Sequence, residues 1–155
     1  MADFKTAVLI TLKNEGGYVD NPLDPGGATN MGIEQKDLPD IDIKSLTQDQ
    51  AIAFYQERYW KPLYSQIEDQ GVANKLFDMG VLFGIGTAVM NIQLALDIMS
   101  DGVFGSETLQ STNGADPASL LSAFKTRLVA RALYIGQIKP SERIFVAGWI
   151  RRINS

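Results

Sequence analysis

The chain has 155 residues, 45% of them hydrophobic and 21% charged, which is the composition of a globular protein with a single core. It contains no cysteine and no histidine, so disulfides, thiolate zinc sites and Ser-His-Asp or Cys-His catalysis are excluded. Proton transfer near neutral pH would therefore have to use carboxylates, tyrosine, lysine or water.

The first predicted helix runs from Ala2 to Glu15. Its apolar face carries residues spaced by four, four and three positions, namely Phe4, Val8, Leu12 and Glu15. Gly16 and Gly17 follow, and we expect glycine in the left-handed C′ position to end the helix. Proline and glycine are frequent after it, so any β structure should be one short hairpin between Tyr18 and Lys44.

Helical patterns dominate the rest of the chain. Thr47 and Gln50 have the spacing of a capping box, which predicts a helix that begins there and continues through Tyr59. Further helices are predicted at Gly71 to Phe83, Thr87 to Met99, from a capping Ser106, Asp116 to about Gly136, and Pro140 to Arg152. The sequence therefore predicts a mainly α protein.

Charge is divided unevenly along the chain, whose net charge is −4. Up to Leu120 there are 7 basic against 17 acidic residues, whereas from Leu121 onward there are 7 basic residues against one acidic. The basic segment is either a pair of amphipathic helices docked on the acidic part or a surface for an anionic polymer. We expect its apolar residues to be buried, and reversal of Arg151 and Arg152 to leave the fold intact; the apolar set is Leu121, Phe124, Leu128, Leu133, Ile144, Phe145 and Trp149.

Glu15 is the first candidate for catalysis. It lies on the apolar side of its predicted helix and at the C-terminal end of that helix. Partial burial and the negative end of the helix dipole both disfavour a charged carboxylate, so they favour an acid that keeps its proton near neutral pH. General-acid catalysis needs such a group. The alternative is a carboxylate at the helix boundary that pairs with a lysine or arginine.

Asp24 and Thr29 lie downstream of Glu15 in a segment rich in turn-formers. Eight residues separate Glu15 from Asp24, and four separate Asp24 from Thr29. If the chain folds back here, Asp24 would face Glu15 and activate a water that Thr29 holds, the layout of a two-carboxylate site for glycosidic bonds. Taken singly, Asp24 is equally typical of a turn and Thr29 of a strand, so only their combination with Glu15 indicates this chemistry.

The stretch EGGYVDNPLDPGGATNMGI, residues 15–33, closely resembles the signature of glycoside hydrolase family 108 muramidases. These are small lysozymes found among phage endolysins and bacterial wall-remodelling or secretion-assisting proteins. The resemblance continues at Tyr59-Trp60, at FDMGVLFG (77–84) and at GWIRR (148–152), while QLALDIMSDGVFGSETLQ (93–110) resembles the family's peptidoglycan-binding part. It implies a lysozyme-like helical fold with at most a short β-hairpin, in which a helical peptidoglycan-binding-like part (86–155) packs on a catalytic part (1–85) as one compact unit.

The resemblance also implies an activity, cleavage of the β-1,4 bond between N-acetylmuramic acid and N-acetylglucosamine. The family's catalytic glutamate corresponds to Glu15. The spacing of Asp24 and Thr29 resembles the Glu/Asp/Thr triad of phage-type lysozymes, which have one residue more before the threonine. Asp20 is a rival for the second carboxylate. We expect inversion at the anomeric carbon, because Thr29 is the right type of residue to hold a water.

Further contacts with sugars are expected from Tyr18, Tyr59 and Trp60, whose rings can stack on a sugar face, and from Asp20 and Asn30. Ordinary core packing is the alternative for the aromatic residues. No metal or organic cofactor is implied. The expected partner is the glycan strand of peptidoglycan, with no nucleic acid and no stable membrane insertion, and the protein is expected to be a monomer.

Two other classes of protein stay open. One is a non-catalytic peptidoglycan-binding protein with the same fold. The other is a helical nucleic-acid module that uses the basic residues after Leu120, although the acidic balance of the rest of the chain argues against it. The N-terminal segment is too short and too interrupted for a signal peptide. We therefore expect synthesis in the cytoplasm and action in the periplasm or cell wall after release or export.

Overall fold

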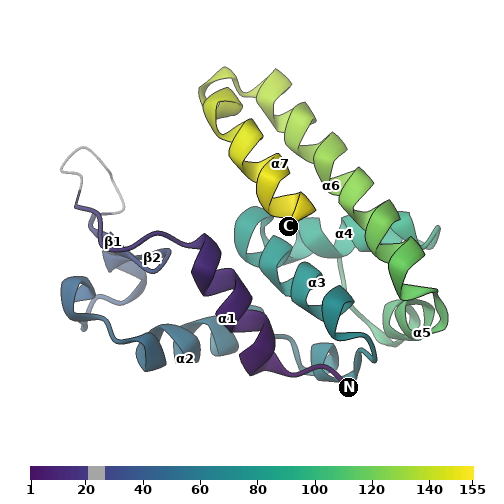
Figure 1. The fold of residues 1–155 in the computed structure, drawn as a ribbon, viewed down its shortest axis with the longest axis horizontal. Helices are drawn as coiled ribbons and strands as arrows, with labels where there is room; N and C mark the ends of the chain where they lie inside the picture. Colours follow the sequence, from purple (N-terminus) through teal and green to yellow (C-terminus); the bar gives the residue numbers. More distant parts are fainter. Residues whose placement is uncertain (21–26) are drawn as a thin grey trace.

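Helices make up most of the protein. The computed structural model describes residues 1–20 and 27–155 (Figure 1). Its α-helices are α1 (Phe4–Asn14), α2 (Gln48–Tyr59), α3 (Gln70–Phe83), α4 (Ile85–Ala95), α5 (Ser106–Gly114), α6 (Pro117–Ile138) and α7 (Val146–Asn154). The strands are β1 (Thr29–Asn30) and β2 (Ile33–Glu34), and 3₁₀ segments are η1 (Gln35–Asp37), η2 (Ile43–Ser45), η3 (Pro62–Gln66) and η4 (Pro140–Phe145). The predicted mainly α fold with one short hairpin is confirmed.

None of the helices in the described part of the chain is long and apolar enough to cross a membrane.

The first helix ends immediately before Glu15. Glu15 leaves the helical conformation (φ −83°, ψ 145°), while its backbone N–H still donates to the carbonyl of Thr11. The expected left-handed glycine is wrong here, because neither Gly16 nor Gly17 has a positive φ. The helix ends at Asn14, and at the extended Glu15 the chain that follows leaves the helix axis.

The β-hairpin is short and sharply turned. β1 and β2 pair antiparallel around Met31 and Gly32, which have φ angles of 49° and 75°. Positive φ at both central residues is the geometry of a tight two-residue hairpin turn. The Asn30 side chain donates to the carbonyl of Ile43 in η2 at 2.9 Å, and this bond ties the hairpin to the segment that follows it.

Helix starts follow their capping signals. The predicted capping box of Thr47 and Gln50 is present at the start of α2, and Asp116 caps α6. α5 begins at the predicted Ser106, but the residue in the cap position is Gly105, and it makes no side-chain capping bond. The prediction of Ser106 as the cap is therefore wrong by one position.

Two hydrophobic clusters meet at α3. The hairpin-side cluster consists of Ala7, Val8, Ile33, Ile43, Leu46, Ala51, Tyr55 and Phe77. The helical-side cluster takes its buried residues chiefly from α3, α4, α6 and α7, among them Leu76, Met79, Ile92, Phe124 and Ile153. Phe77 faces the first cluster, its neighbour Leu76 faces the second, and Trp60 packs against both. α3 is therefore the wall between the two sides of the molecule.

Helix α4 is shorter than predicted. It ends at Ala95 instead of Met99, and Met99 is 78% exposed. The reason is the buried side chain of Gln93, whose amide donates to Asp101 Oδ1 at 2.8 Å and accepts from the Gly102 N–H at 2.9 Å. These bonds draw the chain back over the helix, and the reversal ends α4 before its apolar pattern does.

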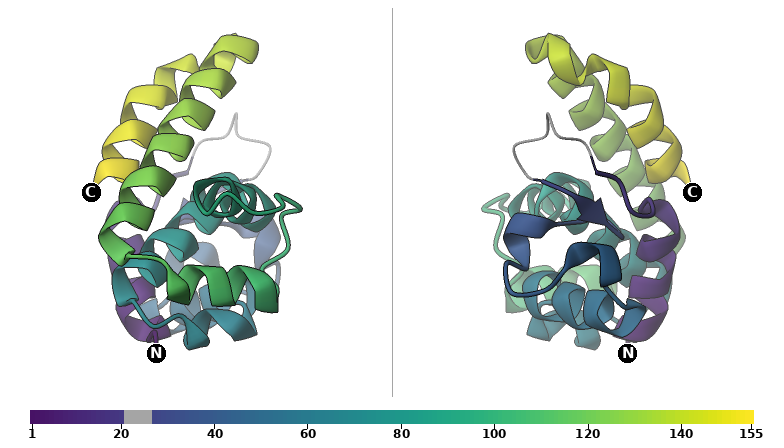
Figure 2. Two further views of the ribbon diagram at one scale, coloured as in Figure 1. Left: turned by 90° about the vertical axis from the view of Figure 1, so that its right-hand side faces the viewer. Right: turned by 90° about the vertical axis from the view of Figure 1, so that its left-hand side faces the viewer.

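The last predicted helix divides into η4 and α7. α6 and α7 form a helical hairpin whose far end extends beyond the rest of the molecule (Figures 1 and 2). Phe124 and Leu128 are buried as predicted, but Leu133, Ile144 and Phe145 are 48%, 79% and 51% exposed. The expected burial of these three is wrong, because they lie on the extended end of the hairpin.

Candidate functional site

Glu15 lies where three parts of the fold meet. It follows the last residue of α1, and the turn of the β-hairpin lies beside its carboxylate. On the opposite side, Arg152 of α7 places its Nη2 atom 2.7 Å from Glu15 Oε1. The Glu15 side chain is 17% exposed, so it is partly withdrawn from water and still reachable.

Arg152 joins Glu15 to a second carboxylate, Asp78 of α3. Arg152 Nη2 lies 2.9 Å from Asp78 Oδ1, and Arg152 Nε donates to the same carboxylate at 3.2 and 3.3 Å. The side chains of Arg152 and Asp78 are only 12% and 3% exposed. Burial alone would lower the pKa of Arg152, but Asp78 and Glu15 reverse this and raise the pKa overall, so the guanidinium stays charged. We call Glu15, Asp78 and Arg152 the clamp.

Asp78 is satisfied by further bonds from α1. Thr11 Oγ1 donates to Asp78 Oδ1 at 2.9 Å, and Asn14 Nδ2 lies 3.5 Å from the same oxygen. Buried charges are tolerated when they are paired and their remaining lone pairs are bonded. The clamp meets this requirement, and it links α1, α3 and α7.

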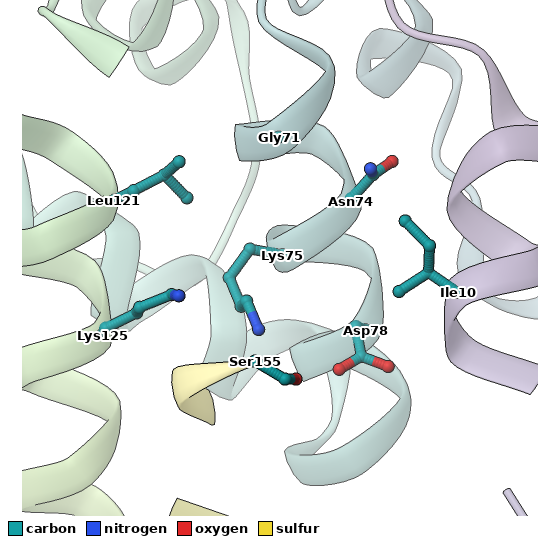
Figure 3. Close-up of a pocket in the computed structure, with 8 residues that line it drawn as sticks. All are labelled: Ile10, Gly71, Asn74, Lys75, Asp78, Leu121, Lys125 and Ser155. Carbon is teal, nitrogen blue, oxygen red and sulfur yellow. The ribbon is translucent and has the colours of Figure 1, made fainter. Parts of the chain in front are cut away.

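A cavity of about 190 Å³ lies beside the clamp, between α1, α3 and α6 (Figure 3). Lys75 and Asp78 line it from neighbouring turns of α3. The Lys75 amine donates to the carbonyl of Arg152, and the Lys125 amine to the carbonyl of Asn154, both at 3.1 Å. Both cations thus bond carbonyls at the C-terminal end of α7, where positive charge is favourable. These two hydrogen bonds hold in place α7, the helix that carries Arg152.

Gly32 and Tyr55 approach Glu15 from the hairpin side. A Cβ atom added to Gly32 would lie 2.5 Å from Glu15 Oε2 and 2.6 Å from the Tyr55 hydroxyl, so only glycine leaves room here. The Tyr55 hydroxyl donates to the carbonyl of Met31 at 2.9 Å, which holds the turn in place. Burial, and after it the negative charge of Glu15, raises the pKa of Tyr55, so its hydroxyl remains a donor.

The structure describes Thr29, Tyr18 and Asp20 of the other predicted site residues. Asp24 lies outside the described residues. Thr29 is half-buried in β1, and its backbone N–H and carbonyl both bond Val19 at 2.8 Å, so it lies opposite the segment that follows Glu15. Tyr18 is 40% exposed, and its hydroxyl is 3.5 Å from Asp20 Oδ2. The roles assigned to Asp24, Thr29, Tyr18 and Asp20 remain predictions.

The three remaining candidates contribute to packing. Asn30 is buried, with its amide bonded to a backbone carbonyl of η2. The Tyr59 ring lies 5.8 Å from that of Tyr55, and Trp60 donates through Nε1 to Ser65 Oγ at 2.9 Å. Contact of these residues with a substrate also remains a prediction.

Sequence reasoning missed the clamp. It treats Arg152 as a surface residue like Arg151, whereas reversal of Arg152 to glutamate would place a third carboxylate against Glu15 and Asp78. The burial and pairing of Arg152 argue against an intact fold after that reversal, whose outcome stays a prediction. The FDMGVLFG and GWIRR motifs contain Asp78 and Arg152, but a pairing across 74 positions leaves no local pattern.

The geometry has features of both interpretations of Glu15, the general acid and the paired carboxylate at a helix boundary. Glu15 pairs with an arginine at a helix boundary, yet the pair is largely buried and the second carboxylate oxygen is not part of it. Across residues 1–20 and 27–155, no group of acidic side chains is arranged to hold a metal ion. What the described site offers is one partly buried carboxyl group, firmly oriented, in a helical protein. Glycoside hydrolysis uses two carboxyl groups, and Glu15 has the position of one of them.

Comparison with known proteins identifies the family. The profile of the Glycosyl hydrolase 108 family matches residues 8–84, a range that includes Glu15, Gly32 and Asp78. The solved structure of Brucella abortus SagA is similar to this chain, with a TM-score of 0.79 and 30% sequence identity over 97% of this chain and 89% of that one. A search of curated proteins gave no match. The chain belongs to the glycosyl hydrolase 108 family, a family of peptidoglycan hydrolases, and its mainly α, lysozyme-like fold is confirmed.

Proposed function

We propose that the protein is an N-acetylmuramidase, which hydrolyses the β-1,4 bond between N-acetylmuramic acid and N-acetylglucosamine in peptidoglycan. The observation that carries the proposal is the position of Glu15. Its carboxyl group is partly buried at the end of α1 and is held from two sides, by Arg152 and by the Gly32 turn. Membership of a peptidoglycan hydrolase family supports a glycan substrate for this group.

In this proposal, the two oxygens of Glu15 have different tasks. Oε1 is paired with Arg152, and Oε2 lies beside Gly32 at the hairpin turn. Oε2 is then the atom that carries the proton and gives it to the glycosidic oxygen as the bond to the muramic acid C1 breaks. Arg152 keeps the carboxyl group in one orientation.

Asp24, helped by Thr29, completes the reaction. Asp24 takes a proton from a water, the water oxygen bonds to C1, and Thr29 holds that water by a hydrogen bond. Attack from the face opposite the leaving sugar inverts the anomeric centre. Proton NMR of the first-formed product should show the α anomer, and a β product would overturn this role. If Asp24→Asn is active and Asp20→Asn is not, Asp20 is the second carboxylate.

The deciding experiment for the activity is digestion of purified peptidoglycan, followed by mass spectrometry of the new reducing ends. New muramic acid ends support the proposal, whereas glucosamine ends or cut peptides contradict it. Glu15→Gln is the matched control, because it keeps the shape of the side chain and removes its acidic proton. We expect its turnover to fall by at least ~100-fold, the scale of general-acid catalysis. An unchanged rate would mean that Glu15 is not the acid.

The setting follows from the substrate. Peptidoglycan lies outside the cytoplasmic membrane, so we propose that the protein acts as a monomer in the periplasm or cell wall after release or export. Phage lysis, as an endolysin, and bacterial wall remodelling or secretion both fit this activity. The two settings are distinguished by the neighbouring genes and by the time of expression.

A further inference from the structure

A surface groove of about 490 Å³ lies against the clamp, on the face formed by α7 and the ends of α1 and α3. Asn14, Trp149, Arg151 and Arg152 are among the residues that line it. Asn14 precedes Glu15 in the chain, and Arg152 is bonded to the Glu15 carboxylate. The groove therefore includes the chain neighbour and the ion-pair partner of the proposed acid, together with residues of α7.

The two arginines of the groove have different surroundings. Arg152 is committed to Asp78 and Glu15, and its side chain is 12% exposed. Arg151 is exposed, and it takes part in none of the ion pairs found among residues 1–20 and 27–155. The groove thus presents an exposed cation to solvent.

Trp149 gives the groove a fixed apolar wall. Its ring packs edge-on against Phe83 at 5.6 Å and is stacked with Phe145 at 6.2 Å, so it cannot turn freely. An aromatic wall beside an exposed cation suits a ligand that has both small apolar groups and carboxylates.

We propose that this groove binds the peptide stem of the muramic acid whose bond is cleaved. The inference rests on the proposed function, because a muramidase cuts at C1 of the sugar that bears the stem on its lactyl group. The stem is an acidic peptide with alanine methyl groups. Arg151 pairs with its carboxylates, and Trp149 contacts its apolar atoms. The substrate class is therefore peptide-bearing glycan, in preference to glycan without stems.

The test compares two substrates prepared from one peptidoglycan sample, peptide-bearing strands and strands stripped of their stems by an amidase. We measure the ratio of kcat/KM on the first to kcat/KM on the second. Arg151→Gln should lower this ratio about fivefold, the effect of losing one exposed ion pair. Arg151→Lys should restore most of it. Arg127→Gln removes the same charge from an exposed position on α6 outside the groove, and should leave the ratio unchanged.

Each result is decisive. An unchanged ratio in Arg151→Gln, or an equal fall in Arg127→Gln, would overturn the inference while the proposed function stands. If the wild-type protein cleaves neither substrate, the proposed function fails. A second measurement then still tests the groove: titration with a soluble N-acetylmuramyl peptide should shift the NMR signal of the Trp149 indole N–H in the wild-type protein. It should shift it less in Arg151→Gln, and no shift in the wild-type protein would overturn the inference.

Discussion

The two sides of the molecule hold Glu15 by different means. On the hairpin side, Gly32 and Tyr55 approach its carboxylate so closely that an added methyl group has no room. On the helical side, Arg152 and Asp78 hold it by charge. The first kind of contact depends on shape and is sensitive to volume, whereas the second depends on paired charges and is sensitive to the loss of either partner. The two sides should therefore respond to substitution in different ways.

The largest effect is expected on the charged side, from Asp78→Ala. This change leaves the Arg152 guanidinium largely buried with only Glu15 beside it, and breaking a buried pair costs about 3–5 kcal/mol. The free energy of unfolding, measured by urea denaturation, should fall by that amount. Asp40→Ala, at an exposed position, is the control and should change it by less than about 0.5 kcal/mol. A loss below about 1 kcal/mol in Asp78→Ala would show that the clamp is not important for folding.

A double variant separates stability from activity. Asp78→Asn with Arg152→Met removes both charges of the buried pair, so it should recover much of the stability lost in either single variant. Turnover should stay low, because Glu15 still lacks its partner on α7. Urea denaturation and turnover should be measured for the wild type, Asp78→Asn, Arg152→Met and the double variant, which together form a complete double-mutant cycle. If turnover recovers together with stability, Arg152 serves the fold only.

On the shape-dependent side, Gly32→Ala should have a smaller effect on stability and a clear effect on rate. The left-handed conformation costs a non-glycine residue about 1–2 kcal/mol, and the new methyl group also displaces Glu15. We expect turnover to fall by about tenfold, as a misplaced catalytic group does. Gly27→Ala is a matched control, because Gly27 has nearly the same φ (76°) but its added Cβ would meet only Gln35, at 3.5 Å. Equal losses of rate in the two variants would contradict the role given to Gly32.

The smallest effect concerns Tyr55 at alkaline pH. Its pKa is raised in the folded protein above the ordinary value of 10.0, so the unfolded chain loses the proton first. The stability that Tyr55 contributes is fully present below pH 10 and is lost as the pH rises beyond it. Tyr55→Phe should therefore show a weaker fall of the unfolding free energy between about pH 10 and 12. Tyr64→Phe should also weaken the fall of the unfolding free energy, because burial alone raises the pKa of Tyr64. Its turnover should not change, because Tyr64 belongs to the helical-side cluster.

Local signals predicted helix starts well and helix ends less well. The capping box at Thr47 and the Asp116 cap were visible because each acts within a few residues. The end of α4 is not visible in the sequence, because it is set by hydrogen bonds from the Gln93 side chain to the loop that follows. Amphipathic spacing also predicted burial for Ile144, which is exposed, because spacing does not say how far a helix extends beyond the core.

The candidate site also has one residue that local signals identify and one that depends on long-range packing. Glu15 could be identified from the apolar face of one helix and from the family signature around it. Arg152 could not, because its partner lies in a distant part of the sequence and nothing in α7 itself distinguishes Arg152 from Arg151. Only packing does so, since one arginine faces α3 and the other faces solvent.

The link between Arg152 and Glu15 also sets an order of events during synthesis. Glu15 leaves the ribosome early, with the whole family signature soon after it, but its charged partner on α7 follows at the end of the described chain. Until α7 has folded back, Arg152 cannot orient Glu15 from the helical side. A chain that stops after Gly84 keeps every residue of the 15–33 signature and lacks Arg152. The orientation of Glu15 by Arg152 is thus a late property of the polypeptide, acquired only when α7 has packed beside the end of α1.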